Sequence, residues 1–163
     1  MTHQAFDLSS FLPYRLAVLA ERVSRRLAAE YQALHGLSIA EWRVMVHLLH
    51  SDEVSIRDIC DYANLDKPKA SRAVKRLEKD GLVEKRSGAK DGRLVAISLT
   101  NAGRRVIYEI LPAAKAVEAN LLGALQLEEQ RALARTMEKL HSALDLDPAA
   151  KPRTLASQGP KTP

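Results

Sequence analysis

The sequence predicts a mainly α-helical protein with one small β-hairpin. Aromatic residues make up only 4% of the 163 residues and there are only seven glycines, and both values disfavour an all-β domain. Apolar residues instead recur at intervals of three and four over long stretches, which is the period of an α-helix. One region departs from this period, because residues 82–86 and 94–99 resemble two short strands on either side of a segment with turn composition.

Composition excludes several classes of protein. Apolar residues make up 46% and charged residues 28%, which is typical of a globular protein rather than a disordered or fibrous one. The longest stretch free of Asp, Glu, Lys and Arg, residues 94–103, is far shorter than the about 20 apolar residues that cross a membrane. The first seven residues lack the pattern of a signal peptide, so we expect a cytoplasmic protein with no membrane partner. Cys60 is the only cysteine, which excludes an intrachain disulfide and a multi-cysteine zinc site.

The net charge of the chain is concentrated in one segment. Residues 66–93 contain ten Lys and Arg against five Asp and Glu, and this difference equals the whole formal charge of +5. A concentrated basic segment is the electrostatic footprint of a protein that binds a polyanion. The alternative is a solvated, lysine-rich helix face.

The N-terminal part predicts one long helix. We expect it over residues 8–35, with Ser9 or Ser10 at its start and Gly36 at its end. Its apolar residues follow the helical period: Leu12, Leu16, Leu19, Val23, Leu27, Tyr31 and Leu34. A small domain does not need a helix of this length, and such a helix often packs against a second chain.

Two capping boxes predict the next two helices. In Ser38-Ile39-Ala40-Glu41 the serine can accept from an early backbone N–H while the glutamate reaches back, which starts a helix over residues 39–50. Ser55-Ile56-Arg57-Asp58 repeats this logic with an aspartate and starts a short helix to about Tyr62. The sequence thus predicts two helices separated by a short break.

A basic helix follows the short one. Asp66 can cap it, Pro68 is tolerated in its first turn, and Gly81 follows its end at Asp80. Its inward residues are expected to be Ala70, Ala73, Val74 and Leu77. Its outward residues include Lys67, Lys69, Ser71, Arg72, Lys75, Arg76 and Lys79. The basic charge of the segment therefore lies on one face of a helix.

The C-terminal part predicts two further helices and a tail. Thr100 caps a helix over residues 101–123 with a bend at Pro112, and a last helix spans about residues 128–143. From Asp147 on, proline, glycine and serine dominate, so we expect a disordered basic tail over residues 147–163.

The order short helix, turn, basic helix and β-hairpin makes a winged helix-turn-helix. An α-helix fits the major groove of DNA, where its outward side chains reach the edges of the bases. A hairpin can place basic side chains in the neighbouring minor groove or along the phosphates. The sequence therefore predicts a DNA-binding protein.

At this point the sequence resembles the MarR-type transcriptional regulators. The resemblance is carried by residues 65–83, which read LDKPKASRAVKRLEKDGLV, and by Asp91-Gly92-Arg93 followed by Leu99-Thr100-Asn101-Ala102-Gly103. The last two runs match the family's wing signature of Asp-x-Arg, five residues and Leu-Thr-x-x-Gly. The resemblance extends over roughly residues 8–144.

The resemblance implies an obligate homodimer that binds a near-palindromic site, with half-sites about 10 bp apart. Residues 1–37 and 100–146 would form interlocked dimerisation helices, and residues 38–99 would form the DNA-binding lobe. Repression is the common outcome in such families. Many members are released from DNA by a phenolic or aromatic carboxylic ligand, so a small aromatic acid or thioester is the expected effector.

We expect the basic helix and the hairpin tip to contact DNA. The candidate residues are Lys67, Pro68, Lys69, Ser71, Arg72, Lys75, Arg76, Lys90, Asp91 and Arg93. Arg72 and Lys69 are assigned to bases, and Ser71 with Lys75 or Arg76 to phosphates. An ion pair with Asp80, four residues on, is the competing role of Arg76.

Two positions depart from the family pattern. Pro68 replaces a more usual serine, which removes a hydroxyl and adds an apolar surface that could meet a thymine methyl. Gly92 replaces a frequent arginine, so the wing would hold the minor groove less strongly, and Lys90 is placed to compensate. Arg93 matches the wing arginine of the family, and Asp91 is placed to orient it.

The ligand cleft implied by the resemblance lies between the dimer helices and the DNA-binding lobe. The candidate residues are Tyr14, Arg15, His35, Trp42, Arg43 and His47. Arg15 or Arg43 could pair with a carboxylate while Trp42 flanks a ring. Core packing is the alternative for Trp42, and an ion pair is the alternative for each arginine. Residues 11–15 and 41–44 resemble a branch of the family associated with hydroxycinnamate-type metabolism.

Other functions fit the sequence less well. Cys60 would allow redox sensing, although a buried core thiol is the better interpretation. His47 and His50 could share a metal, but no acidic or cysteine cluster completes the site, so no metal and no cofactor are expected. The chain lacks a phosphate-binding glycine loop and hydrolase motifs, so an enzyme is not expected. A helical homodimer that docks other proteins is the remaining alternative.

Overall fold

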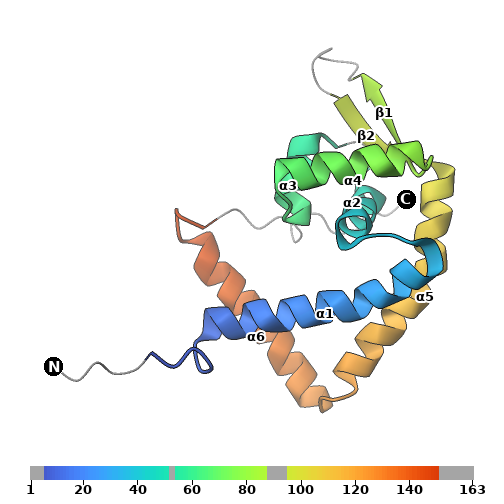
Figure 1. Ribbon diagram of the computed structural model, residues 1–163. Helices are drawn as coiled ribbons and strands as arrows, with labels where there is room; N and C mark the ends of the chain where they lie inside the picture. Colours follow the sequence, from blue (N-terminus) through green and yellow to red (C-terminus); the bar gives the residue numbers. More distant parts are fainter. Residues whose placement is uncertain (1–5, 52–53, 88–94, 151–163) are drawn as a thin grey trace.

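The computed structural model describes residues 6–51, 54–87 and 95–150 and is mostly helical (Figure 1). In chain order its elements are α1 (Leu12–His35), α2 (Ile39–His50), α3 (Ile56–Ala63), α4 (Lys67–Lys79), β1 (Val83–Ser87), β2 (Val95–Leu99), α5 (Asn101–Leu122) and α6 (Leu127–Asp145). The predicted fold class, helices with one small hairpin, is confirmed. Within the described residues, no helix is long and apolar enough to cross a membrane.

The elements separate into a lobe and an extended helical part. Figure 1 shows α2, α3 and α4 gathered beneath the hairpin and α1 running below them, while α5 leads away from this lobe and α6 turns back across α1 in this view. β1 and β2 are antiparallel, with Val83 opposite Leu99 and Lys85 opposite Ile97. Val54 adds a single bridge to Ile97, which ties the segment before α3 to the hairpin. α4 therefore lies on a lobe that also carries the wing.

The core joins the lobe to the C-terminal half of α1 and the N-terminal half of α5. Its largest fully buried side chains are Tyr31, Met45, Leu48, Ile59, Leu77, Ile97, Ile107 and Ile110. By contrast, α6 buries none of its residues. The four residues predicted to face inward from the basic helix, Ala70, Ala73, Val74 and Leu77, are all buried. The orientation of α4 follows from this face, because turning it outward would expose the apolar side chains.

The predicted N-caps of the lobe are present. Ser38 Oγ accepts a hydrogen bond from the backbone N–H of Glu41 at 3.3 Å, and a glutamate oxygen accepts from the N–H of Ser38 at 2.7 Å. Ser55 and Asp58 form the same reciprocal box at the start of α3. Asp66 accepts from the N–H of Lys69 at 2.8 Å. Local side chains therefore define where these three helices begin.

The start of α1 differs from the prediction. The helix begins at Leu12 with no capping side chain, rather than at Ser9 or Ser10. The reason is local, because Asp7 accepts hydrogen bonds from both the N–H and the hydroxyl of Ser9, at 2.9 and 2.6 Å. These contacts form a separate turn ahead of the helix. The end of α1 is as predicted, since Gly36 adopts the left-handed conformation with φ of 66°.

Two segments for which we made predictions lie outside the described residues. The hairpin tip, residues 88–94, and the end of the chain, residues 151–163, lie there. The predicted contacts of Lys90, Asp91 and Arg93 and most of the predicted disordered tail therefore fall on residues that are not described. α5 continues as a helix through Pro112, where a bend was expected.

Candidate nucleic-acid interface

The outer face of α4 is a row of exposed polar side chains. The apolar face packs on the core, and the opposite face leaves Lys67, Pro68, Lys69, Ser71, Arg72, Lys75 and Arg76 exposed. All seven residues predicted for this helix thus lie at the surface. Because an α-helix fits the major groove, these side chains have the placement that base and phosphate contacts require.

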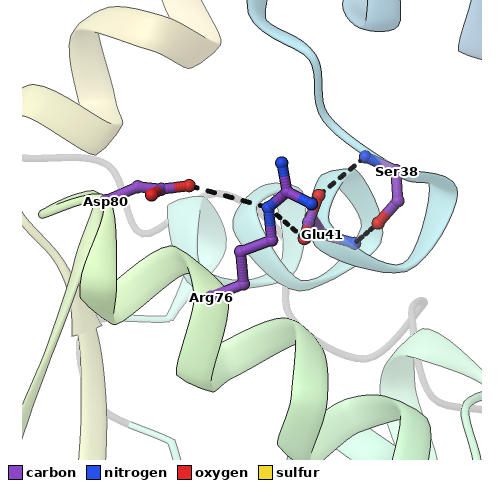
Figure 2. A network of polar contacts seen from close by, with 4 residues as sticks. All are labelled: Ser38, Glu41, Arg76 and Asp80. Atoms are coloured by element: carbon purple, nitrogen blue, oxygen red, sulfur yellow. Dashed lines mark hydrogen bonds and ion pairs between the residues drawn. The ribbon is translucent and has the colours of Figure 1, made fainter.

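The basic residues of α4 differ in how they are held. Lys69 Nζ lies 3.0 Å from the carboxylate of Asp66, a local pair between exposed side chains. Arg76 Nε lies 3.8 Å from Asp80, as the sequence predicted, and 3.4 Å from Glu41, which it did not predict (Figure 2). Lys67, Arg72 and Lys75 form no ion pair with another described residue. These three cations, together with Lys79 at the end of the helix, are therefore available to a polyanion without breaking an existing pair among the described residues.

The base of the wing is tied to the same helix. Lys85 Nζ on β1 lies 2.6 Å from Glu78 on α4, and Arg86 pairs with Glu84 within the strand at 2.7 Å. No pattern in the sequence predicted the Lys85–Glu78 pair, because it joins two elements whose relative position is not encoded locally. This pair sets the wing beside the exposed face of α4.

A basic cleft separates the start of α2 from α4. It has a volume of about 220 Å³ and is lined by Ser38, Ala40, Glu41, Lys69, Arg72, Ala73 and Arg76. Three of these side chains are cationic and one is acidic. The positive charge of α4 therefore extends from its exposed face into the junction with α2.

Two of the predicted ligand residues, Trp42 and Arg43, pack against α1 within the single chain. Trp42 is buried and stacks on Tyr31, with ring centroids 5.1 Å apart and an angle of 17° between the planes. Burial raises the pKa of Tyr31 to about 12, which the nearby Arg43 opposes. Arg43 donates a hydrogen bond to Ser24 on α1 at 3.3 Å. Trp42 is thus packed in the core of the chain, which was the alternative to a role in ligand binding.

The other residues lie apart from that cluster. His35, at the end of α1, approaches Glu109 on α5 at 3.0 Å. His47 stacks on Tyr62 of α3, while Tyr14 and Arg15 are exposed on the first turns of α1. Within the described single chain the six residues do not share one set of contacts. A common ligand site for them stays a prediction.

His47 is a buried ring with an unsatisfied nitrogen. It is 7% exposed, stacks on Tyr62 at 4.3 Å, and its Nε2 has no hydrogen-bond partner among the described residues. Burial lowers the pKa of His47 from 6.5; the charge of Asp58 opposes this shift and His50 adds to it. The folded protein therefore binds fewer protons at this ring than the unfolded chain between the lowered pKa and 6.5.

Replacing His47 with Phe is expected to flatten the pH dependence of stability. In the wild type, the free energy of unfolding should fall as the pH drops from above 6.5 towards the lowered pKa, because the unfolded chain then takes up the proton. The phenyl ring keeps the stacking and removes the unsatisfied nitrogen, so stability at about pH 7.5 should rise by about 1 kcal/mol. Urea unfolding at several pH values measures both effects. The exposed His141→Gln variant is the control, and an unchanged pH slope in H47F would contradict the prediction.

The structure gives little support to the two alternative sensing functions, redox sensing by Cys60 and metal binding. Cys60 is half-buried against the core, and burial, followed by Asp61, raises the pKa of its thiol. A reactive thiol needs the opposite shift, because the thiolate is the nucleophile. Within the described residues, no group of three or more His, Cys, Asp and Glu side chains is placed to hold a metal ion.

The comparisons with known proteins agree with this geometry. A family model described as MarR family matches residues 35–94, which include α2, α3, α4 and β1 and end just before β2. A crystal structure of a MarR-family transcriptional regulator from Silicibacter pomeroyi superposes with a TM-score of 0.72 at 27% identity, covering 87% of this chain and 95% of that one. Residues 35–94 of this chain match the MarR family, and the chain resembles its members over most of its length. Members of this family are DNA-binding transcriptional regulators and not enzymes.

Two curated relatives extend the similarity over most of this chain. An uncharacterised HTH-type transcriptional regulator of Bacillus subtilis, YdgJ, is 25% identical over 140 residues, 85% of each chain. An HTH-type transcriptional repressor of Mycobacterium tuberculosis is 28% identical over 133 residues, 81% of this chain and 92% of the relative. The similarity thus includes the helices that flank the lobe.

Proposed function

We propose that this protein is a homodimeric repressor of the MarR type that reads a near-palindromic operator with α4. The observation that carries the proposal is the exposed basic face of α4, where Lys67, Arg72 and Lys75 have no ion-pair partner among the described residues. Cations already neutralised by carboxylates gain less from a phosphate than free ones, so the free ones dominate the contact. Repression is supported by the mycobacterial relative, which is described as a repressor.

The side chains of α4 divide into two proposed roles. Arg72 and Lys69 lie on the first two turns, at the cleft beside α2, and read base edges. Ser71, Lys75 and Arg76 hold phosphates, and Pro68 offers an apolar contact to a thymine methyl. The wing residues Lys90, Asp91 and Arg93 contribute minor-groove or phosphate contacts, as the family resemblance implies.

Apolar surface outside the lobe supports the dimer. The first half of α1 and all of α6 expose large apolar side chains: Leu12, Tyr14, Leu16, Val18, Leu19, Leu127, Leu133, Met137, Leu140 and Leu144. A contiguous apolar surface of this kind marks an interface, because burying it removes it from water. In the proposed dimer, residues 1–37 and 100–146 supply the interface.

The proposed effector is a small aromatic acid or its thioester. Tyr14, Arg15, His35, Trp42, Arg43 and His47 are its candidate contacts, and Tyr14 and Arg15 are exposed on the half of α1 that we assign to the dimer face. An organohalide-sensing regulator of the same fold, 21% identical, has a structure with 2,4-dichlorophenol bound. That ligand belongs to that protein. A ligand can release DNA only if it prefers one spacing of the two α4 helices.

Selection of bound sequences from a random DNA pool tests the proposal. The purified protein is incubated with the pool at about 150 mM salt, where binding through phosphates alone is partly suppressed. We expect enrichment of an inverted repeat with half-sites about 10 bp apart, since two copies related by a two-fold axis read one helical turn each. The enriched duplex then serves to screen aromatic acids and thioesters for release.

A folded dimer that enriches no motif would contradict the proposal. The basic face would then be assigned to a partner other than specific DNA, and the alternative of a helical homodimer that docks other proteins would gain support. Enrichment of a single half-site without a repeat would contradict the dimer but keep the DNA-binding role of α4.

A further inference from the structure

One buried carboxylate connects the start of α2 with the recognition helix. The Glu41 side chain is 6% exposed, and its two oxygens have different partners. Oε2 accepts a hydrogen bond from the backbone N–H of Ser38 at 2.7 Å, while Oε1 lies 3.4 Å from Nε of Arg76 (Figure 2). The same side chain thus completes the capping box of α2 and forms an ion pair with α4.

Arg76 is the counter-charge of this carboxylate. A buried carboxylate is costly unless it is paired, and Arg76 is the cation that the structure places against it among the described residues. Glu41 is held by its burial and by the capping box, whereas the Arg76 side chain is 64% exposed. Glu41 is therefore the fixed partner. Without it, Arg76 would be a long solvated side chain with several rotamers.

This pair differs from the other pairs on α4. Lys69 and Asp66 are both exposed and lie three residues apart, so their pair changes little in stability or position. The Glu41–Arg76 pair joins two helices, with Asp80 adding a second carboxylate 3.8 Å from the same nitrogen. Figure 2 shows the guanidinium between these two carboxylates. The arginine is thus held from both sides.

We propose that Glu41 is a positioning residue for DNA recognition and acts through Arg76. It holds the guanidinium at the mouth of the cleft that Lys69 and Arg72 also line, and it ties α4 to the start of α2. An arginine ordered before binding loses less conformational freedom when DNA arrives, and we expect this gain to outweigh the positive charge that Glu41 neutralises, so affinity increases. This inference rests on the proposed binding of DNA by α4.

Replacing Glu41 with Gln separates the ion pair from the cap. Glutamine also serves at this position of a capping box, so α2 keeps its start. The variant leaves the exposed Arg76 with Asp80 as its remaining carboxylate, and it creates no buried unpaired charge. We expect affinity for the duplex enriched from the random pool to fall about five- to tenfold, a decrease in the usual range for a coupled pair. The unfolding midpoint should stay at the wild-type value.

A double-mutant cycle with Arg76→Gln separates positioning from a general structural effect. R76Q leaves Glu41 buried without its counter-charge, so this variant should be less stable than the wild type, and E41Q/R76Q should regain stability. In DNA binding, E41Q should have no further effect once Arg76 is removed, because it acts through Arg76.

Glu129→Gln is the matched control. Glu129 accepts from the backbone N–H of Gln126 at 2.7 Å in the capping box of α6, and it forms no ion pair with another described residue. The same chemical change there should leave DNA affinity unaltered. All variants are compared by fluorescence anisotropy with the enriched duplex at constant salt and by urea unfolding.

The outcomes separate this inference from the proposed function. Weaker binding by E41Q, unchanged stability and no additional decrease in the R76Q background would support the positioning role. Unchanged or tighter binding by E41Q, or an equal decrease in both backgrounds, would overturn it. If the wild type and E129Q bind no duplex specifically, it is the proposed function that fails.

Discussion

Replacing Arg72 with Ala is expected to weaken binding to the operator and to relax its base preference. Arg72 is exposed on the outer face of α4 and has no ion-pair partner among the described residues. A bidentate contact between arginine and guanine supplies about 1–3 kcal/mol of discrimination, which corresponds to roughly 5- to 150-fold in affinity. Anisotropy titrations with the enriched duplex and with single-base variants of it measure both effects. The decrease should be largest on the preferred base and nearly absent on the substituted one.

Lys75→Ala provides the contrast on the same face. A lysine at a phosphate contributes no base preference, so its removal should lower affinity similarly on all duplexes. The slope of log K against log salt should become shallower by about 1 for each phosphate that no longer meets a lysine, or about 2 for the dimer. If R72A behaved like K75A, with a uniform decrease on all sequences, Arg72 would bind a phosphate and its assignment to a base would be wrong.

Replacing Gly103 with Ala is expected to destabilise the protein strongly. A Cβ atom at this position would lie 2.1 Å from the carbonyl oxygen of Leu82 and 3.0 Å from a methyl carbon of Leu99. The same carbonyl accepts a hydrogen bond from the N–H of Thr100 at 3.1 Å, so the start of α5 is fixed against the start of the wing. Because the clash is with backbone, the two elements must separate. We expect the free energy of unfolding to fall by about 1–3 kcal/mol or more.

The predicted loss of stability in G103A is opposite to the effect that helix propensity alone would have. In the interior of an unobstructed helix, alanine is about 1 kcal/mol more favourable than glycine. Gly123→Ala, at the end of α5, is the control, because its Cβ would meet only backbone oxygens of its own helix at 3.1 and 3.6 Å. Urea unfolding should show a change within about 1 kcal/mol for G123A. A stable G103A variant would mean that α5 and the wing are not packed as closely as described.

Local signals in the sequence predicted most of the secondary structure. Ser38, Ser55 and Asp66 each cap a helix because their side-chain oxygens accept from a backbone N–H three residues on. The buried face of α4 was predicted from the spacing of its apolar residues alone. The predicted start of α1 was wrong because Asp7 competes for the hydroxyl and N–H of Ser9, and spacing does not show which of two local arrangements is more stable.

The candidate site was predictable only in part. The exposed residues of α4 follow from the helical period, and the pair between Arg76 and Asp80 follows from their spacing of four. The pair between Arg76 and Glu41 does not, since these residues lie in different helices. The positions of Trp42 and His47 are similar cases, because each ring stacks on a residue from another helix, Tyr31 and Tyr62 respectively.

The helices, the caps of α2, α3 and α4, the basic face of α4 and the resemblance to a family of DNA-binding regulators could all be predicted from the sequence. These depend on contacts between residues three or four positions apart, which a single chain segment already contains. Three contacts became apparent only in the folded protein: the pair of Glu41 with Arg76, the pair of Lys85 with Glu78, and the packing of Trp42 on α1. These contacts join distant segments, and their geometry depends on how the helices pack around the shared core rather than on any one segment.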